Sequence, residues 1–480
     1  DSLGSLLSSA QSIASNFSLP ANDFIVSPGV YVGTSALGIS KKNGPIWETI
    51  VPNGPNSNAM TSLVMDPNGV LWAGTLANGS GSGFYRFDLS RNDTTRWKIF
   101  TNSIDPIMQS NDYYSVSMGA NGSVWASSWG TGVVEVVADT IKRKYDYYSK
   151  PSLPGALLTA QTYVVTGGVA VDNSGNTWIV NLDMYSPRSL FKFTSDTTDV
   201  PYDNILSLAA PFLGVVIDQN NTKWMINSVA FNTNEIGLFY FNENDSLPST
   251  INGWGKLSIS NGLPDNAILS LALDLNGSLW VGTSSGAAII SDLSNPSGSI
   301  TTAYALTSQF VQSIAVDATN TKWVGTKEGV LLVSADGTEL LNQYTVASTG
   351  GMLADDDVRS IALDQARGIA YFGTENGLSS VNIGVVQTQA NYTKLKIYPN
   401  PYLIPNNNLL TIRNLTPNST IKILTVSGIL VTQFDAQGGG QATWDGKNSR
   451  GALVPSGIYI VVAFTQDNKT VAGKVAVIRH

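Results

Sequence analysis

A sequence unit with two short apolar runs recurs along most of this 480-residue chain. In most copies the first run ends in Asp, a turn rich in Gly and Asn follows, and the second run contains an aromatic residue, often before Gly-Thr. The most regular copies are SLVMDPNGVLWAGT (62–75), SLALDLNGSLWVGT (270–283) and SIAVDATNTKWVGT (313–326). Short runs joined by tight turns and repeated at this length predict the four-stranded antiparallel blades of a β-propeller.

Each copy places one aromatic residue at the same point of its second run, and successive copies lie 41 to 56 residues apart. Because the position repeats, we expect these side chains to form the core between blades rather than a surface for stacking sugars. An Asp lies six residues before five of the Trp residues, and we expect it to cap a hairpin rather than bind calcium. The aromatic positions are Tyr31, Trp72, Trp125, Trp178, Trp224, Trp280, Trp323 and Tyr371.

The number of blades stays open at seven or eight. Eight copies over residues 24–383 predict eight blades, but the first copy has no clear first strand and the last has no clear fourth strand. Seven blades plus a fragment of a preceding propeller is therefore the alternative. Residues 1–23 form an N-terminal segment, for which a closing strand is one interpretation. Since the chain starts at Asp1 without a signal peptide, we expect it to be processed or truncated.

Composition excludes several kinds of site. There is no Cys, and the one His is His480, so disulfides, thiolate metal sites and His-dependent triads cannot form. Lys+Arg 27 and Asp+Glu 35 give a net charge of −8 without a basic stripe, which argues against nucleic acid as a partner. No apolar run reaches about 18 residues, so no transmembrane segment is predicted. We predict no catalytic residue, no metal site and no cofactor, and we expect Asp355-Asp356-Asp357 to be a solvated turn.

The repeat stops near residue 383, and residues 384–394 form a polar linker. Residues 395–480 contain about seven strand-like runs, which predict an immunoglobulin-like β-sandwich. The fold class is thus all-β, a seven- or eight-bladed β-propeller followed by a β-sandwich. We expect Pro399 and Pro401 to keep the first strand of the sandwich away from the centre of a sheet, Trp444 to cap the core, and Gly446 and Gly451 to supply turn geometry.

This C-terminal segment resembles the type A sorting domain of type IX secretion cargo. The resemblance implies export through the outer membrane of a Gram-negative bacterium of the Bacteroidetes, to the cell surface or the medium. It rests on a set of matching positions and on the final strand, KVAVIRH. The matching positions are Tyr398, Pro399, Asn400, Pro401, Trp444, Asp445, Gly446, Asn448, Gly451, Gly457, Ile458 and Tyr459.

The repeats, with LWVGTSSG and KWVGTKEGV as their most specific segments, resemble the two-component-regulator type of propeller repeat over roughly residues 24–383. A propeller with a sorting domain is similar to the non-enzymatic surface propellers of the type IX secretion system. That resemblance implies partnership with translocon or sortase proteins, and with lipopolysaccharide or another surface glycan during cargo attachment. One alternative is a secreted cargo protein that acts as an adhesin or glycan-binding propeller. Another is a polysaccharide-degrading propeller enzyme that uses carboxylates.

Five aromatic residues break the repeat and fall in predicted loops of two neighbouring blades. The loops before the first strand and after the second strand of a blade share one face of a propeller, so we expect these side chains to gather there. Aromatic faces bind sugar rings and partner side chains, although padding of long loops is the structural alternative. The candidate ligand-binding residues are Tyr113, Tyr114, Trp129, Tyr163 and Tyr185.

Overall fold

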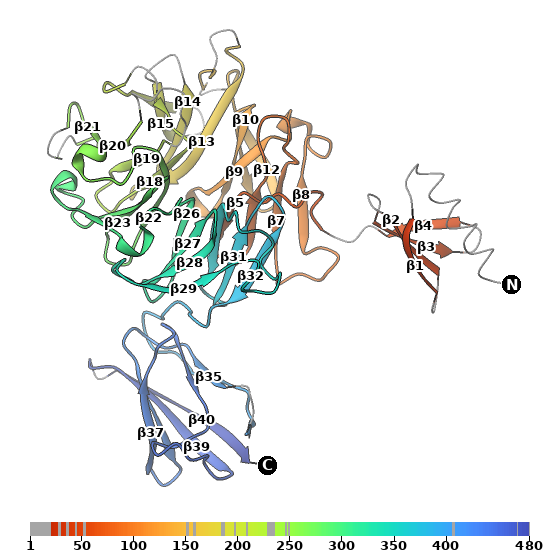
Figure 1. The fold of residues 1–480 in the computed structure, drawn as a ribbon, viewed down its shortest axis with the longest axis vertical. Helices are drawn as coiled ribbons and strands as arrows, with labels where there is room; N and C mark the ends of the chain where they lie inside the picture. The colour runs from red at the N-terminus through yellow and green to blue at the C-terminus, as the bar shows by residue number, and fades with distance from the viewer. Residues whose placement is uncertain are drawn as a thin grey trace. The chain divides into compact units, whose positions relative to one another are not determined.

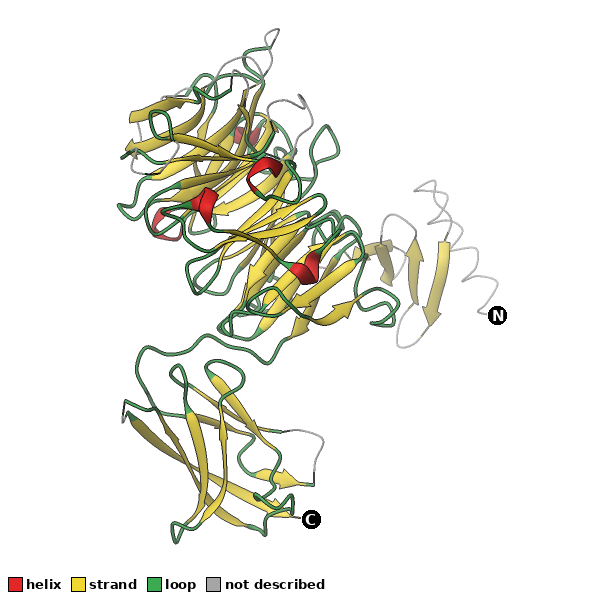
Figure 2. Ribbon diagram, turned by 60° about the vertical axis from the view of Figure 1, so that its left-hand side comes forward, coloured by secondary structure: helices red, strands yellow, loops and turns green. Residues whose placement is uncertain are grey.

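The computed structural model describes the backbone of residues 21–26, 30–34, 38–43, 46–50, 54–149, 153–156, 160–183, 188–195, 198–207, 210–227, 236–244, 247, 250–405, 409–467 and 469–479. Regular structure in these residues is almost entirely β-sheet, as Figure 2 shows. The helices among them are short 3-10 turns: η1 Pro106–Met108, η2 Ala120–Gly122, η3 Ile259–Asn261, η4 Pro296–Gly298 and η5 Tyr304–Leu306. The predicted all-β class is confirmed.

The strands between residues 62 and 382 follow one another in seven sets, which Figure 1 shows arranged around a ring. The first three sets are β5 Ser62–Met65, β6 Leu71–Gly74, β7 Phe84–Phe87 and β8 Trp97–Phe100; β9 Tyr113–Met118, β10 Val124–Gly130, β11 Val133–Val137 and β12 Thr140–Tyr145; and β13 Val164–Val171, β14 Thr177–Asp183, β15 Arg188–Ser195 and β16 Thr198–Asp203, with β17 Ala210–Pro211 beside β14.

The remaining four sets have the same meander order, and the last set has three strands. They are β18 Gly214–Ile217, β19 Lys223–Ile226, β20 Leu238–Phe241 and β21 Trp254–Leu257; β22 Ile268–Leu273, β23 Leu279–Thr283, β24 Gly286–Ile290 and β25 Ile300–Thr302; β26 Ser313–Val316, β27 Lys322–Thr326, β28 Gly329–Val333 and β29 Leu340–Tyr344; and β30 Ser360–Asp364, β31 Ile369–Gly373 and β32 Leu378–Asn382. Consecutive pairing by short turns is what the repeat predicts for blades.

The last set contacts the first in the way that neighbouring sets contact each other. The hydroxyl of Ser62 on β5 accepts a hydrogen bond from the N–H of Val116 on β9, at 3.0 Å. At the equivalent position of β30, the hydroxyl of Ser360 accepts one from the N–H of Leu63 on β5, at 2.7 Å. The Arg367 guanidinium also donates to the carbonyl of Gly69, at 2.9 Å. The seven sets, hereafter the blades, therefore close on one another.

The first copy of the repeat forms a sheet of its own. Its strands are β1 Ala21–Val26, β2 Val30–Thr34, β3 Gly38–Asn43 and β4 Ile46–Ile50, and they form a four-stranded sheet in that order. Residues 1–55 and 89–98 make one compact unit, and the rest of the chain makes another. The strands from β5 onward close from Leu63 to Ser360, and the start of the propeller at residue 24 stays a prediction. Residues 1–20 lie outside the described residues.

The repeated aromatic residues form the core of the blades, as predicted. From Trp72 to Tyr371 these side chains are at most 4% exposed; the side chain of Tyr31 is outside the described part. The Asp six residues earlier supports each hairpin, and in four of the five Asp–Trp pairs it also accepts a hydrogen bond from the indole. In Asp218, Oδ1 accepts from the N–H groups of Asn220 and Thr222, and Oδ2 accepts from Trp224 Nε1 at 2.9 Å. The same indole bond recurs in the pairs Asp172–Trp178, Asp274–Trp280 and Asp317–Trp323.

A buried lysine links consecutive blades at two places. The Lys322 ammonium lies 4.4 Å from the ring centre of Trp280, in the preceding blade, and bonds Asp274 Oδ2 at 3.1 Å. Lys223 lies 3.9 Å from the ring centre of Trp178 in the same manner. Burial raises the pKa of Asp274, but hydrogen bonds from Lys322 and nearby N–H groups outweigh it and hold the pKa below its ordinary value. A buried charge needs such a partner, so the lysines contribute to the cohesion of the ring.

The C-terminal domain is a sandwich of two sheets. One sheet has the order β33-β35-β38 and the other β34-β40-β39-β36-β37, where β34 pairs in parallel with β40. Their inner faces share one core that includes Ile412, Ile423, Trp444 and Val461. This confirms the predicted β-sandwich. The strands are β33 Lys396–Tyr398, β34 Tyr402–Ile404, β35 Leu410–Arg413, β36 Thr420–Thr425, β37 Leu430–Asp435, β38 Gln441–Trp444, β39 Gly457–Phe464 and β40 Thr470–Arg479.

Candidate functional site

Tyr113 is part of the blade core and not an exposed loop residue. Its side chain is completely buried on β9, its ring centre lies 5.4 Å from that of Phe84, and its hydroxyl donates to the carbonyl of Met108 at 3.1 Å. Burial raises the pKa of the Tyr113 phenol. Adjacent residues of a strand point to opposite faces, so Tyr113 and Tyr114 cannot both face the same surface. The prediction that Tyr113 binds a ligand on an exposed loop is wrong for this reason.

Tyr114, Trp129 and Tyr163 come together, and we name them the aromatic platform. The rings of Tyr114 and Trp129 meet edge to face, with centroids 5.5 Å apart at 78°. All three half-buried side chains pack on one small core of Ala156, Val165 and Leu182. Tyr163 belongs to the segment between β12 and β13, whereas Trp129 lies on β10. The platform therefore joins the second and third blades. Tyr114 and Trp129 lie on β9 and β10, and not in the loops in which they were predicted.

The members of the aromatic platform differ in how firmly they are held. The Tyr114 hydroxyl donates to the carbonyl of Thr166 at 2.6 Å, and burial raises its pKa. Tyr163 lies over Gly130, where a Cβ atom would meet the phenol ring at 2.5 Å. Glycine at this position therefore provides the space that the Tyr163 ring occupies. Burial, and then the charge of Asp112, raise the pKa of Tyr163.

Asp112 fixes the loops around the aromatic platform. Its carboxylate accepts hydrogen bonds from the N–H groups of Gly79 and Gly81 in the first blade, both at 2.9 Å. Its backbone carbonyl accepts one from the N–H of Trp129, at 2.8 Å. One residue thus connects the first blade to the platform. Tyr185, the fifth candidate, lies outside the described residues.

The Asp355-Asp356-Asp357 segment is built as a turn. The carboxylates of Asp355 and Asp356 accept hydrogen bonds from backbone N–H groups, and Asp357 pairs with Arg359 at 2.9 Å. Every member thus has a structural role, in agreement with the solvated-turn interpretation. Among the described residues no group of three or more His, Asp or Glu side chains is arranged to hold a metal ion.

The Tyr-Pro-Asn-Pro motif closes the edge of the larger sandwich sheet. Asn400 Oδ1 accepts from the N–H of Ala476 on β40 at 3.0 Å, and its amide donates to the carbonyl of Lys474 at 3.3 Å. The Asn400 side chain thus makes the two hydrogen bonds to β40 that the backbone of a paired strand would make, just before β34 begins. β33 and β34, on either side of the motif, are both edge strands, as the prolines require. The role of Asn400 was missed, since the sequence shows no register between these strands.

The other motif residues also build the sandwich. Trp444 is 3% exposed, its indole donates to the carbonyl of Lys447 at 2.8 Å, and its ring lies 5.8 Å from that of Tyr459. Gly446 and Gly451 adopt φ of 77° and 78°, which confirms their predicted turn geometry. Asp445 accepts from the N–H of Lys447, and Gly457 begins β39. Tyr398, which ends β33, is 43% exposed. The matching positions are thus largely the framework of this domain.

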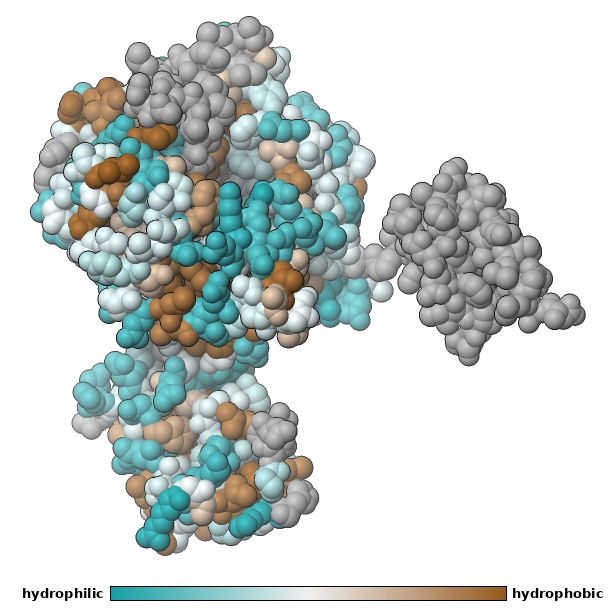
Figure 3. Space-filling view, in the orientation of Figure 1, coloured by the Kyte–Doolittle hydropathy of each residue, from teal (hydrophilic) through white to brown (hydrophobic). Residues whose placement is uncertain are grey.

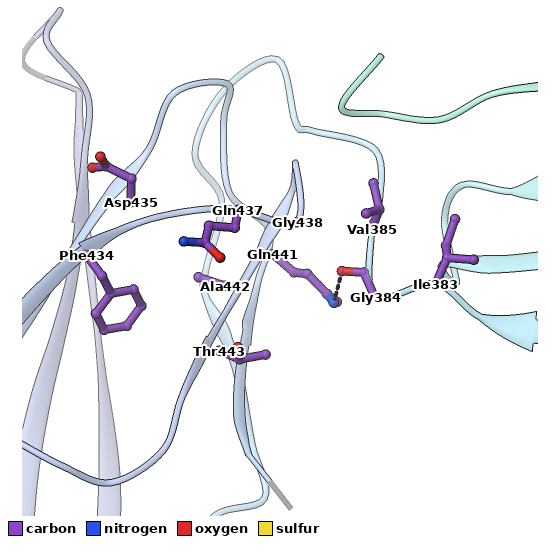
Figure 4. A pocket seen from close by; sticks show the side chains of 10 residues that line it. All are labelled: Ile383, Gly384, Val385, Phe434, Asp435, Gln437, Gly438, Gln441, Ala442 and Thr443. Carbon is purple, nitrogen blue, oxygen red and sulfur yellow. Dashed lines mark hydrogen bonds between the residues drawn. The ribbon is translucent and has the colours of Figure 1, made fainter. Parts of the chain in front are cut away.

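Figure 4 shows a pocket of about 430 Å³ between the linker and the sandwich. Ile383, Gly384 and Val385 line one side, and residues 434–443 of the sandwich line the other. The Gln441 amide donates to the carbonyl of Gly384 across it, and Arg413 in turn donates to Gln441 at 2.9 Å. Gln441 therefore joins the linker to the sandwich at this pocket.

Exposed apolar side chains lie on both the ring and the sandwich. Figure 3 shows them as separate groups between polar residues on the viewed faces of the ring and the sandwich. Large exposed examples lie far apart in the chain, such as Tyr148, Tyr304, Met352 and Val426. Within the residues that the structure describes, no helix has the length and apolar character needed to cross a membrane.

Comparisons with known proteins agree with this architecture. The two-component regulator propeller model matches residues 54–77, whereas no curated protein matches the chain. The structure of PorZ, a surface component of the type IX secretion system of Porphyromonas gingivalis, is similar with a TM-score of 0.64 and 22% identity, over 95% of this chain and 64% of that one. The extracellular domain of the hybrid two-component system BT3049 of B. thetaiotaomicron gives 0.51 and 14%, over 96% and 61%. The chain spans less than two thirds of either protein and shares their β-propeller fold.

Proposed function

We propose that this protein is a non-enzymatic cell-surface propeller that acts with the type IX secretion system. The observation that carries the proposal is the likeness to PorZ, which extends over 95% of this chain, ring and sandwich included. The Tyr-Pro-Asn-Pro and Trp-Asp-Gly positions that resemble a sorting domain lie within the sandwich. In this proposal the sandwich directs export through the outer membrane, and the ring contacts partners at the cell surface.

In this proposal the ring has two tasks at the cell surface. It assists the sortase complex, and it contributes to the attachment of lipopolysaccharide to cargo. The aromatic platform supports a binding role because its three half-buried rings join two blades and lie beside loops that Asp112 fixes. Rigid aromatic side chains lose little conformational entropy when they bind, which suits them to protein or sugar partners.

A surface adhesin exported as cargo is the second candidate. The same aromatic platform favours it, because half-buried rings also suit a glycan outside the secretion machinery. A polysaccharide-degrading enzyme has less support, since the carboxylates of residues 355–357 hold the turn in which they lie. The two leading candidates differ in whether the mature protein keeps the sandwich.

Replacing Trp129 and Tyr163 together by Ala should weaken binding to the purified sortase complex or to purified lipopolysaccharide. Truncation of such anchors typically costs at least ~2 kcal/mol, roughly thirtyfold in affinity. Tyr114 is left in place because its hydroxyl bonds Thr166 inside the protein. Biolayer interferometry with each partner would measure the change.

A matched control is Tyr304→Ala, which removes an exposed tyrosine from the turn η5. Its affinity should equal that of the unaltered protein. Equal affinity for the double variant as well would contradict a binding role of the platform. A strongly lowered melting temperature of the double variant would show that Trp129 and Tyr163 are core residues instead.

A further inference from the structure

A second cavity lies between the second and third blades. The inference drawn from it concerns a site that the proposed function does not use. The volume of this cavity is about 390 Å³, within the range of small-molecule sites. Leu153 and Phe191, both almost completely buried, form its floor. Tyr147, Pro154 and Pro201 form its walls, and Arg188 and Asp199 complete the lining. We name this cavity the side pocket.

Tyr147, which lines the side pocket, is an exposed aromatic residue outside the blade core. Tyr147 is 37% exposed and its neighbour Tyr148 is 75% exposed. Their rings stand perpendicular, with centroids 5.4 Å apart, and the Tyr147 hydroxyl donates to the Gln161 side chain at 3.3 Å. This bond holds the hydroxyl end of the Tyr147 side chain, which lines the cavity.

A hydrogen-bond donor, Arg188, and an acceptor, Asp199, both line the side pocket. The Arg188 guanidinium pairs with Asp203 at 3.2 Å while about half of both side chains is exposed. An ion pair this exposed contributes little to stability, so folding alone gives no strong reason for it. Asp199 is paired with Phe193 in the β15–β16 ladder and lies close enough to Arg188 to feel its charge. The Asp199 side chain is half-buried, and this burial raises the pKa of its carboxyl group.

We propose that the side pocket binds one pyranose ring of a saccharide. A pyranose has an apolar face of C–H groups, which would lie against the Tyr147 ring and the two prolines. Its edge carries hydroxyl groups that both donate and accept. Asp199 accepts from such hydroxyls and Arg188 donates to them, so the two side chains satisfy neighbouring hydroxyls of one ring.

A peptide strand fits this place less well than a sugar. β16 is the outer strand of its sheet, and a peptide would have to add to this edge through backbone hydrogen bonds. Pro201 lies in the middle of β16 and has no N–H to donate, which interrupts the ladder that such a strand requires. An apolar peptide side chain would also leave both Arg188 and Asp199, which line the cavity, without a hydrogen-bond partner in the ligand.

Saturation-transfer difference NMR on the full chain tests the proposal with the methyl glycosides of glucose, galactose, mannose and N-acetylglucosamine at millimolar concentration. At least one glycoside should receive saturation. Tyr147→Ala and Asp199→Asn should each weaken its binding roughly tenfold or more, whereas the control Tyr304→Ala should leave it unchanged.

Three results would overturn the proposal. The first is no saturation transfer to any of the four glycosides, and the second is equal binding by the Tyr147→Ala protein with an unaltered melting temperature. The third is competition by a decaproline peptide without any glycoside binding, which would make the side pocket a peptide site. None of these results bears on export or on the aromatic platform, so the proposed function is tested separately.

Discussion

Deleting residues 395–480 should leave the protein in the periplasm of the native cell. The sandwich has its own core, distinct from those of the blades, and its deletion ends the chain after the linker. The ring should therefore still fold, because the contacts that close it lie between Leu63 and Ser360 and between Gly69 and Arg367. Cell fractionation and surface labelling with an antibody against the ring would measure the loss of display.

A fusion provides the matched arm of this experiment. Residues 384–480 attached to a periplasmic reporter should carry the reporter to the cell surface, since linker and sandwich are joined by backbone bonds of their own. A full-length Trp129→Ala protein should be displayed normally. Undiminished display of the deleted chain would mean that the sandwich is not a sorting domain.

Trp280→Ala should destabilise the ring by about 3–5 kcal/mol, from lost burial and from the cavity that remains. The side chain is completely buried, its indole donates to Asp274 at 3.2 Å, and the Lys322 ammonium lies against its ring. Removing it takes a hydrogen-bond donor from a buried carboxylate and a π-face from a buried cation. Urea unfolding followed by the fluorescence of the remaining Trp residues would measure the free energy.

Tyr304→Ala serves as the control for stability also, because its ring is exposed. It should change the free energy of unfolding by no more than about 0.5 kcal/mol. A loss below about 1 kcal/mol for Trp280→Ala would be incompatible with a fully buried Trp between two blades.

The repeated core could be predicted from the sequence because its signal recurs. An aromatic residue with an Asp six positions earlier implies one side chain in the core and one at the hairpin, and both are found. The same spacing could have revealed the indole bond to Asp. Where Gly119 replaces Asp, Ser123 accepts the indole bond of Trp125 at 3.1 Å. Different side chains, Asp or Ser, can thus accept the hydrogen bond of the repeated indole N–H.

Features that depend on long-range contacts or on the exact start of a strand could not be predicted from the repeat. Ring closure depends on contacts such as Leu63 to Ser360, which no local pattern shows. Tyr113 looked like a loop residue because the start of β9 could not be fixed to one residue. A shift of one position in a strand exchanges the core face and the outer face.

The side pocket could not be found from the sequence, for a related reason. Tyr147 and Pro154 come from the segment after β12, and Asp199 and Pro201 come from β16. They share no motif and no spacing, and only the packing of two blades brings them together. In the sandwich, by contrast, the motif positions were visible because Trp444 and the two turn glycines have strict local requirements.

The linker explains why the mature protein is expected to keep its sandwich. The Val386 side chain is buried, its N–H donates to the carbonyl of Gly438 at 3.0 Å, and its own carbonyl accepts from Gly440 at 2.7 Å. The N–H of Gln389 donates to Leu415 at 2.8 Å. A peptide segment held in this way must first detach before a protease can bind it in an extended form.

Mass spectrometry of the protein purified from the surface of native cells tests the central claim most directly. A component of the secretion machinery that retains its sorting domain should yield peptides that reach β40, the final strand of the sandwich. A surface protein whose peptides end within residues 384–394 would contradict the account, because the sandwich would then be a signal removed from an exported cargo.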